Sequence, residues 1–464
     1  MNLPSLSPLQ IMRWMVPAFV TVSLVAAEGI VASPPKPKPL NIVFILADDM
    51  GWNQVSYHGS QFYETPNIDR IAAAGMQFRQ AYSAAPICSP TRAALMTGKY
   101  PARLHLTDYI PGGMWEEKPL VTPTMQQGLP LEETTIPEML HTRGYVSGLF
   151  GKWHLAPTYD YEAWRPMDPE SQGFDEVYHT RKPEPEDIGK PDAHNATAIT
   201  DRALNFIERN KDGQFFCYIA HNVVHRPYGE ELAQIVKFRG KRDSLRPENN
   251  AVMAAMIERM DQNIGRVLAK LRELHLEENT VVIFTSDNGQ VMGDQQQKPF
   301  RGGKATIWEG GLRIPLAVRW PGVVKPGTIS QEPVITMDLF STIMEISGTV
   351  YLPRLHDGLS LMPILAGKAD TLGREALYWH YPHYHHLGDF RPGSVVRMGR
   401  YKLIEWFEGS LLNQGPAFEL FDLEADQGET TDIALEKPEL AAVMRRKIVD
   451  WRERVGAQMM TVRR

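Results

Sequence analysis

The stretch Ile42-Val43-Phe44-Ile45-Leu46, followed closely by Asp48-Asp49, decides how this chain folds. A continuous apolar run of this length is typical of a strand covered on both faces, as in a mostly parallel sheet. Helical patterns separate this run from three similar ones, the clearest over residues 252–274. The alternation predicts an α/β fold, with a large and mostly parallel sheet sandwiched between helices. The other apolar runs are 146–150, 215–220 and 281–284.

Polar side chains follow every one of these four runs. In open α/β sheets, ligands gather beyond the carboxyl ends of the strands, so one layout would bring the four polar clusters together. The clusters after 42–46 and 281–284 offer only hard oxygen ligands, which suit calcium, or magnesium as the alternative, rather than zinc. Either cluster alone is more simply interpreted as a set of turn residues that cap a strand. The predicted metal ligands are Asp48, Asp49, Asp287 and Asn288, with Cys88 beside them.

The run Cys88-Ser89-Pro90-Thr91-Arg92 predicts the start of a helix, with Pro90 near its first position. Helix N-termini favour negative charge, which makes Cys88 a candidate nucleophile beside the anion-binding cation Arg92. The other cysteine, Cys217, lies inside an apolar run and is interpreted as a core residue rather than a disulfide partner.

The remaining polar residues after the strands are cations and proton carriers. A tetrahedral anion needs several such donors once water leaves its site. Solvated surface groups are the alternative for each of them. His221 is interpreted as a core histidine or one behind the site. The predicted catalytic set is Cys88, Arg92, Lys152, His154, His225 and Lys304.

The N-terminus predicts export to the periplasm or beyond the cell. Residues 1–27 combine Arg13, an apolar run and small residues at a plausible cleavage site, and a Pro-rich linker follows over 28–39. The apolar run is short for a membrane span, which needs about 20 residues, so a cleaved signal is favoured over an anchor, and no later run predicts a stable span. A net charge of −6 argues against nucleic acid as a partner.

Taken together, these motifs resemble the type I, formylglycine-dependent sulfatases of the alkaline phosphatase superfamily. The resemblance rests on the order and spacing of six motifs: Ala47-Asp48-Asp49-Met50-Gly51-Trp52, the Cys88 to Arg92 run, Gly151-Lys152-Trp153-His154-Leu155, His225-Arg226-Pro227, Thr285-Ser286-Asp287-Asn288-Gly289 and Gly302-Gly303-Lys304. It implies a catalytic domain over 40–371 and a smaller α+β domain with an antiparallel sheet over 372–464.

The resemblance also implies the chemistry. The cysteine that matches Cys88 is oxidised by a formylglycine-generating or anaerobic maturation enzyme, and one hydroxyl of the hydrated aldehyde attacks sulfur. Calcium would be held by the four oxygen ligands, with Asp287 taking a proton from the attacking hydroxyl and Arg92 holding the diol. Lys152, His225 and Lys304 would grip the sulfate. His225 or Lys304 would protonate the departing alcohol, and His154 would help release sulfate.

Residues 379–386 read Trp-His-Tyr-Pro-His-Tyr-His-His, either an exposed aromatic loop or a wall that binds a sugar. With this stretch the chain looks similar to bacterial carbohydrate sulfatases. A sulfated galactose or N-acetylgalactosamine, sulfated at position 4, is the expected substrate. Two alternatives stay open: a phosphonate or phosphodiester hydrolase, and a sulfate-binding protein in which Cys88 is unmodified. The residues expected to bind the saccharide are His380, His383, His385 and His386.

Overall fold

Four apolar runs of the sequence form neighbouring parallel strands in the computed structural model, which describes residues 40–113, 115–291, 298–387 and 390–464. They are β8 (Thr280–Ser286), β1 (Asn41–Ala47), β7 (Phe215–Ala220) and β5 (Val146–Gly151), in that order across the sheet. The predicted signal and linker, 1–39, lie outside the described residues. Among the described residues, no helix has the length and apolar character to span a membrane.

The continuous apolar runs follow from burial on both faces of this sheet. Along β1, Ile42 and Phe44 pack into one hydrophobic cluster, while Val43 and Ile45 pack into the cluster on the opposite face. Because side chains alternate across a strand, a strand covered twice has no position where a polar residue would reach water. The prediction of a large, mostly parallel sheet between helices is therefore confirmed.

Four further strands complete the sheet. On one side β6 (Glu176–His179) pairs in parallel with β5. On the other side β10 (Leu316–Arg319) runs antiparallel to β8 and to β2 (Met76–Phe78), and β11 (Thr328–Ser330) closes the edge. A small sheet joins β3 (Ala81–Tyr82), β9 (Arg313–Ile314) and β12 (Val334–Ile335).

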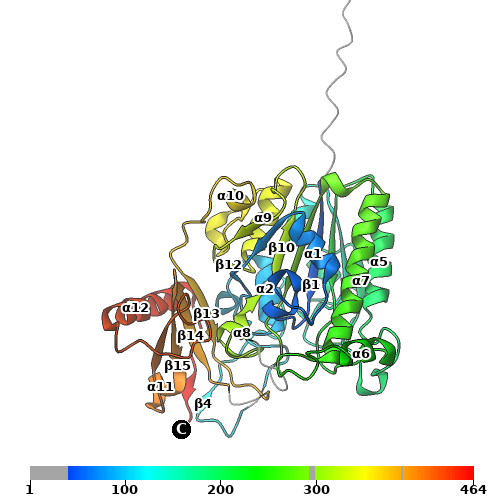
Figure 1. Cartoon of the computed structure of the whole chain (residues 1–464). Coiled ribbons are helices and arrows are strands. Elements are labelled where there is room, and N and C mark those ends of the chain that lie inside the picture. The colour runs from blue at the N-terminus through cyan, green and yellow to red at the C-terminus, as the bar shows by residue number, and fades with distance from the viewer. Residues whose placement is uncertain (1–39, 114, 292–297, 388–389) are drawn as a thin grey trace, which may run out of the picture. The chain divides into compact units, whose positions relative to one another are not determined.

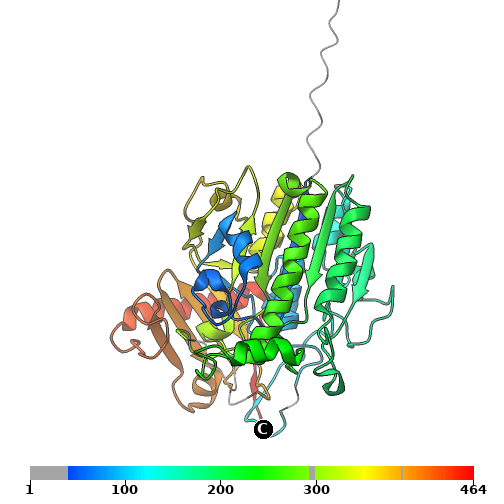
Figure 2. The same ribbon diagram turned by 45° about the vertical axis from the view of Figure 1, so that its right-hand side comes forward.

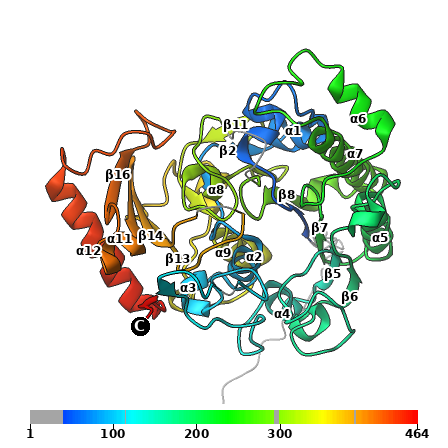
Figure 3. The same cartoon turned by 90° about the horizontal axis from the view of Figure 1, so that it is seen from below.

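Helices cover both faces (Figure 1 and Figure 3). One face carries α1 (Pro66–Ala73), α5 (Ala196–Arg209) and α7 (Ala251–Glu273), with α6 (Leu232–Arg239) packed on α7. The predicted helix at 252–274 is α7, and Figure 2 shows it in green beside α5. The other face carries α2 (Cys88–Thr97), α4 (Ile136–His141), α9 (Asp338–Ser347) and α10 (Met362–Leu365).

An antiparallel sheet forms the C-terminal part, as the resemblance implied. Its strands are β13 (Leu377–Tyr381), β14 (Gly393–Met398), β15 (Tyr401–Trp406) and β16 (Phe418–Asp422), and α12 (Pro438–Val455) packs on β14 and β15. The remaining α-helices and strands are short: α3 (Pro101–Leu104), α8 (Glu309–Leu312), α11 (Phe407–Leu412), β4 (Leu120–Val121) and β17 (Thr461–Val462).

The C-terminal sheet shares a hydrophobic core with the helix that begins at Cys88. Trp379, Val395 and Leu403 pack in one cluster with Cys88 and Ala94 of α2. The indole of Trp379 also donates a hydrogen bond to the carbonyl of Ser83, 2.8 Å away. The boundary at residues 371 and 372 falls between α10 and β13 and stays a prediction, since the packing across it is continuous.

A buried cluster of charges joins the two parts. The Nζ of Lys402 on β15 lies 3.1 Å from Glu309 Oε1 of α8 and 2.7 Å from Glu429 Oε1. All three side chains are fully buried. Burial, reinforced by Glu309 and opposed by Lys402, raises the pKa of Glu429 to about 7. Charges taken out of water in this way need their partners, because an uncompensated buried charge is costly.

We therefore predict that Lys402→Met lowers the free energy of unfolding by about 3 kcal/mol at pH 8, because a buried carboxylate loses its counter-ion. The loss is smaller at pH 6, where Glu429, with its raised pKa, takes up a proton and needs no partner. Urea titration followed by fluorescence measures both values. The control is Arg446→Met, which removes an exposed pair with Asp450 and costs less than about 1 kcal/mol. An equal loss for the two variants at pH 8 contradicts the prediction.

Candidate active site

Three buried carboxylates meet at the carboxyl edge of the large sheet. Asp48 and Asp49 follow β1, and Asp287 follows β8, the strand beside it. One oxygen from each lies within 4.8 Å of the others, and the three side chains are at most 1% exposed. Asp49 has φ of 63°, a left-handed conformation that is uncommon for a residue with a side chain. Its backbone N–H donates to Asp287 Oδ1 at 3.1 Å, which holds the two chain segments together.

The donor set fits a hard cation such as calcium or magnesium. Asn288 adds an amide whose Nδ2 donates to Asp49 Oδ1 at 2.8 Å, so its Oδ1 is left as an acceptor. That Oδ1 is buried and has no hydrogen-bond partner among the described residues. A buried acceptor beside three carboxylates is what a cation with oxygen ligands would satisfy. The four predicted metal ligands that carry oxygen therefore lie together.

Each carboxylate is also paired with a cation from another part of the chain. Arg92 Nη2 lies 2.8 Å from Asp287 Oδ2, Lys152 Nζ lies 2.7 Å from Asp48 Oδ2, and Lys304 Nζ lies 2.7 Å from Asp49 Oδ1. Arg92 Nη1 donates to the carbonyl of Lys152 at 3.0 Å as well. These contacts bring together residues that are 60 to 255 positions apart in the sequence.

The charges shift one another's pKa values in the directions that pairing and burial dictate. Burial raises the pKa of Asp49, but Lys304, His225 and Lys152 outweigh it, and that pKa is lowered overall. The pKa of Asp287 is raised by burial and by Asp48, although Arg92 opposes them. Burial also raises the pKa of the Cys88 thiol, against the effect of Lys152 and Lys304. An unmodified Cys88 is therefore a poor thiolate nucleophile.

The residues after Cys88 hold it at the first position of α2. Thr91 Oγ1 accepts a hydrogen bond from Ala85 N at 3.1 Å and donates one to Ala85 O at 3.0 Å, so it pins the preceding loop. Ser89 Oγ accepts from Ile110 N at 3.2 Å. Pro90 is the third residue of the helix, close to the predicted place, where its missing N–H leaves no intrahelical bond unmade.

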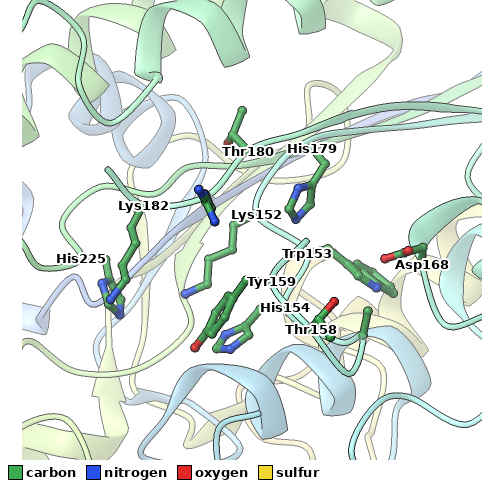
Figure 4. Close-up of a pocket in the computed structure, with 12 residues that line it drawn as sticks. Lys152, Trp153, His154, Thr158, Tyr159, Asp168, His179, Thr180, Lys182 and His225 are labelled. Carbon is green, nitrogen blue, oxygen red and sulfur yellow. The ribbon is translucent and has the colours of Figure 1, made fainter. Parts of the chain in front are cut away.

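Cys88 opens into a cavity of about 200 Å³, here called the inner cavity. Asp49, His154, His225 and Lys304 line it too. Figure 4 shows Lys152, His154 and His225 gathered in the adjoining space, about 30 Å³ in volume, from the loops after β5 and β7. Of the predicted catalytic residues, only Arg92 lines neither space, since it lies behind the carboxylates.

Hydrogen bonds to carbonyls determine which nitrogen of each histidine carries its proton. His154 Nε2 is 3.0 Å from the carbonyl of Ile110, and His225 Nδ1 is 2.6 Å from the carbonyl of Arg226. A carbonyl can only accept, so those nitrogens are the donors and the opposite ones, His154 Nδ1 and His225 Nε2, are acceptors. Burial, together with nearby lysines, lowers both pKa values well below the usual range, so both rings are neutral.

The four histidines expected to bind the saccharide divide into two pairs. His385 and His386 line the inner cavity and stack on each other, with ring centroids 4.3 Å apart. His380 and His383 do not line it: His380 bonds to Ser394 Oγ, and His383 Nε2 bonds to Thr107 Oγ1, both at 2.8 Å.

Two further residues lie where the sequence placed them. His221 is 1% exposed and does not line the inner cavity, as expected of a histidine in or near the core. Cys217 is fully buried on β7, and burial raises its thiol pKa well above the usual value. Among the described residues, neither cysteine forms a disulfide.

Sequence reasoning missed several residues of the cavity wall. Tyr159 stacks on His154 with ring centroids 4.9 Å apart, and Tyr109, Lys182 and Arg226 also line the inner cavity. Tyr109, Tyr159 and Lys182 come from irregular loops, where no periodicity or motif marks a residue as functional. Arg226 directly follows His225 in the motif His225-Arg226-Pro227, and this position could have identified it as a residue of the site.

A family model described as Sulfatase matches residues 40–349, and one for the C-terminal region of N-sulphoglucosamine sulphohydrolase matches 303–454. This chain belongs to the sulfatase family. It is 32% identical to a sulfatase of Formosa agariphila, over 89% of this chain and 88% of that protein. It is also 32% identical to the N-acetylgalactosamine-6-sulfatase of Homo sapiens, over 75% of this chain and 72% of that one.

Solved structures agree with the family assignment. The crystal structure of Ps i-CgsB is similar with a TM-score of 0.75 and 26% identity, over 89% of this chain and 93% of that one. The same protein in complex with k-i-k-neocarrahexaose gives 0.74 and 27%, over the same shares. The fold is that of the alkaline phosphatase superfamily, and the protein is a sulfuric ester hydrolase, a sulfatase.

We predict that Asn288→Ala weakens calcium binding about tenfold or more, because it removes the buried oxygen that has no other partner. Isothermal titration calorimetry of the purified protein with calcium, after treatment with a chelator, measures the affinity. Asn53→Ala is the matched control, since Asn53 Oδ1 is also a buried acceptor without a partner among the described residues, but its Nδ2 donates to the carbonyl of Lys298 rather than to a carboxylate of the cluster. Calcium affinity that is unchanged in Asn288→Ala would rule out this ligand set.

Proposed function

We propose that this sulfatase removes sulfate from a sulfated carbohydrate, with Cys88 converted to formylglycine by a maturation enzyme. One observation carries the proposal: Cys88 lines the same cavity as Asp49, His154, His225 and Lys304. The hydrated aldehyde of that residue supplies the nucleophile for sulfur. A thiol with a raised pKa is a poor nucleophile and leaves the surrounding cations and histidines without a role. The diol of a hydrated aldehyde makes use of both.

Held by Asp48, Asp49, Asp287 and Asn288, a calcium ion would offset the carboxylate charge and act as a Lewis acid towards a sulfate oxygen. The chain's own residues do the rest. Arg92, anchored by Asp287 and by the carbonyl of Lys152, orients the side chain at position 88. Lys152 and Lys304 donate hydrogen bonds to the sulfate oxygens, over which negative charge spreads as the ester bond breaks, and His225 would join them once its Nε2 has taken up a proton.

Asp287, Lys304 and His154 already have the protonation states that the proposed proton transfers need. Asp287, a carboxylate, takes the proton of the attacking hydroxyl. Lys304 carries a proton and lines the inner cavity, so it is the donor for the departing alcohol; His225, whose Nε2 is an acceptor, would serve only after taking up a proton. His154 presents Nδ1 as an acceptor with no partner among the described residues, which suits removal of a proton when sulfate is released.

The relatives support a saccharide substrate. Several curated relatives are N-acetylgalactosamine-6-sulfatases, and Ps i-CgsB binds a neocarrahexaose. We therefore propose a sulfated galactose or N-acetylgalactosamine unit, held in part by His385 and His386. Position 4 was expected from the sequence, whereas the names of the relatives favour position 6. Export through the signal over 1–27 fits a polymeric substrate met outside the cytoplasm.

Replacing Cys88 by Ala is expected to lower kcat on an aryl sulfate at least about a thousandfold, because the nucleophile is lost. Cys217→Ala, the control, keeps turnover, since that thiol lies in the core of the sheet. Mass spectrometry of the tryptic peptide over 80–92, from protein made in the native host, checks the modification. A peptide lighter than the cysteine form, and reactive towards hydrazides, is the expected result. An alkylatable thiol with full turnover refutes the proposal.

A panel of substrates tests the reaction and the sugar. We expect faster turnover of an aryl sulfate than of the matched aryl phosphonate, and release of sulfate from 6-sulfated or 4-sulfated galactose and N-acetylgalactosamine. Ion chromatography of free sulfate measures the release. Hydrolysis of the phosphonate in preference to the sulfate would overturn the reaction. Activity on aryl sulfates alone, with no sulfated sugar hydrolysed, would overturn the saccharide proposal.

A further inference from the structure

A second and larger hollow adjoins the inner cavity. This outer hollow, about 560 Å³ in volume, is lined by residues between 159 and 195. Cavities that bind small molecules typically measure about 300–1,000 Å³, so the inner cavity of about 200 Å³ has room for the reacting unit at most, whereas the outer hollow has room for a further sugar unit. Tyr159 and Lys182 border both of them, and also the narrow space beside Lys152.

Lys182 therefore lies at the junction between the inner cavity, where the sulfate would react, and the outer hollow. Figure 4 shows its side chain extending next to His225. His386 also lines the inner cavity, and its pKa is lowered by burial and by the positive charges of Lys304 and Lys182. A group attached to the departing alcohol would have to pass this ammonium.

Charge pairing sets Lys182 apart from its neighbours. Arg181 lies 3.5 Å from Glu184 and 3.8 Å from Asp160, and Lys190 lies 2.7 Å from Asp187. Lys182 makes no hydrogen bond or ion pair within the part of the chain that the structure describes. The lysines deeper in the site, Lys152 and Lys304, are already paired with aspartates.

An unpaired ammonium on a flexible stem, at the junction of two cavities, is suited to bind an anion that enters with the substrate. Beside it, the rings of Tyr161 and His179 stack with centroids 5.4 Å apart and line the outer hollow, which gives a flat surface for a sugar ring. The outer hollow thus combines space, a platform and one uncompensated positive charge.

We infer that Lys182 binds an anionic substituent, a carboxylate or a second sulfate, on the sugar unit next to the one that loses its sulfate. The inference rests on the proposed function and extends it: the substrate class becomes an acidic oligosaccharide, and the outer hollow becomes the site of its second unit.

Binding is measured by calorimetry in a Cys88→Ala background, so that the result does not depend on turnover. Three sulfated disaccharides serve as probes, in which the neighbouring unit is neutral, carries a carboxylate, or carries a second sulfate. With Lys182 present, at least one acidic disaccharide binds about three- to fivefold more tightly than the neutral one, as expected for one largely exposed charge pair. The advantage shrinks as salt is raised.

Lys182→Met is expected to remove this advantage while the affinity for the neutral disaccharide changes less than about twofold. Lys182→Arg keeps it. Lys190→Met is the matched control, because that lysine lines the same hollow but is paired with Asp187. The identity of the preferred acidic disaccharide tells whether carboxylate or sulfate is the natural group.

Two results overturn the inference. One is equal affinity for all three disaccharides, or no detectable binding of the acidic ones, with Lys182 in place. The other is an equal loss for neutral and acidic disaccharides in Lys182→Met, which would assign Lys182 to the reacting sulfate or to the fold. Hydrolysis of an aryl sulfate by the wild-type enzyme tests the proposed function separately, so the two failures are distinguishable.

Discussion

Three carboxylates buried at one edge of a parallel sheet are the constraint on which the rest of this structure depends. Asp48, Asp49 and Asp287 come within 4.8 Å of one another with almost no exposure to water. Such an arrangement is strongly unfavourable unless positive charge reaches it. Arg92 and Lys152 supply that charge from α2 and from the loop after β5, and Lys304 supplies it from a third segment. The need to compensate the carboxylates therefore also brings the proposed sulfate-binding groups to the edge of the sheet.

The same cations have two uses. Lys152 and Lys304 are paired with Asp48 and Asp49, yet their proposed work is to hold sulfate oxygens. The two roles are compatible. A divalent ion would neutralise the carboxylates in place of the lysines, and the two ammonium groups would then be available to an incoming anion. Asn288, whose buried Oδ1 has no partner among the described residues, adds an acceptor that such an ion could use.

The C-terminal sheet supports the site without lining most of it. Trp379 packs in the same hydrophobic cluster as Cys88, and Tyr381 donates a hydrogen bond to Asp108 Oδ1 at 3.0 Å. Two residues beyond Asp108, the carbonyl of Ile110 determines which nitrogen of His154 carries the proton. The C-terminal sheet therefore contacts both Cys88 and the loop segment that orients His154.

The sequence by itself determined the parallel sheet, the helix that starts at Cys88, and most of the carboxylates and cations that meet at the edge of the sheet. These follow from local pattern: apolar runs buried on both faces, a proline near a helix start, and polar residues after strands. It could not distinguish His385 and His386 from His380 and His383, since all four stand in one short stretch and only packing turns two towards the cavity. Tyr159 and Lys182 were invisible to it as well. Their loops have no periodicity, and their place beside Cys88 arises only when strands distant in sequence pair and bring their carboxyl ends to one edge.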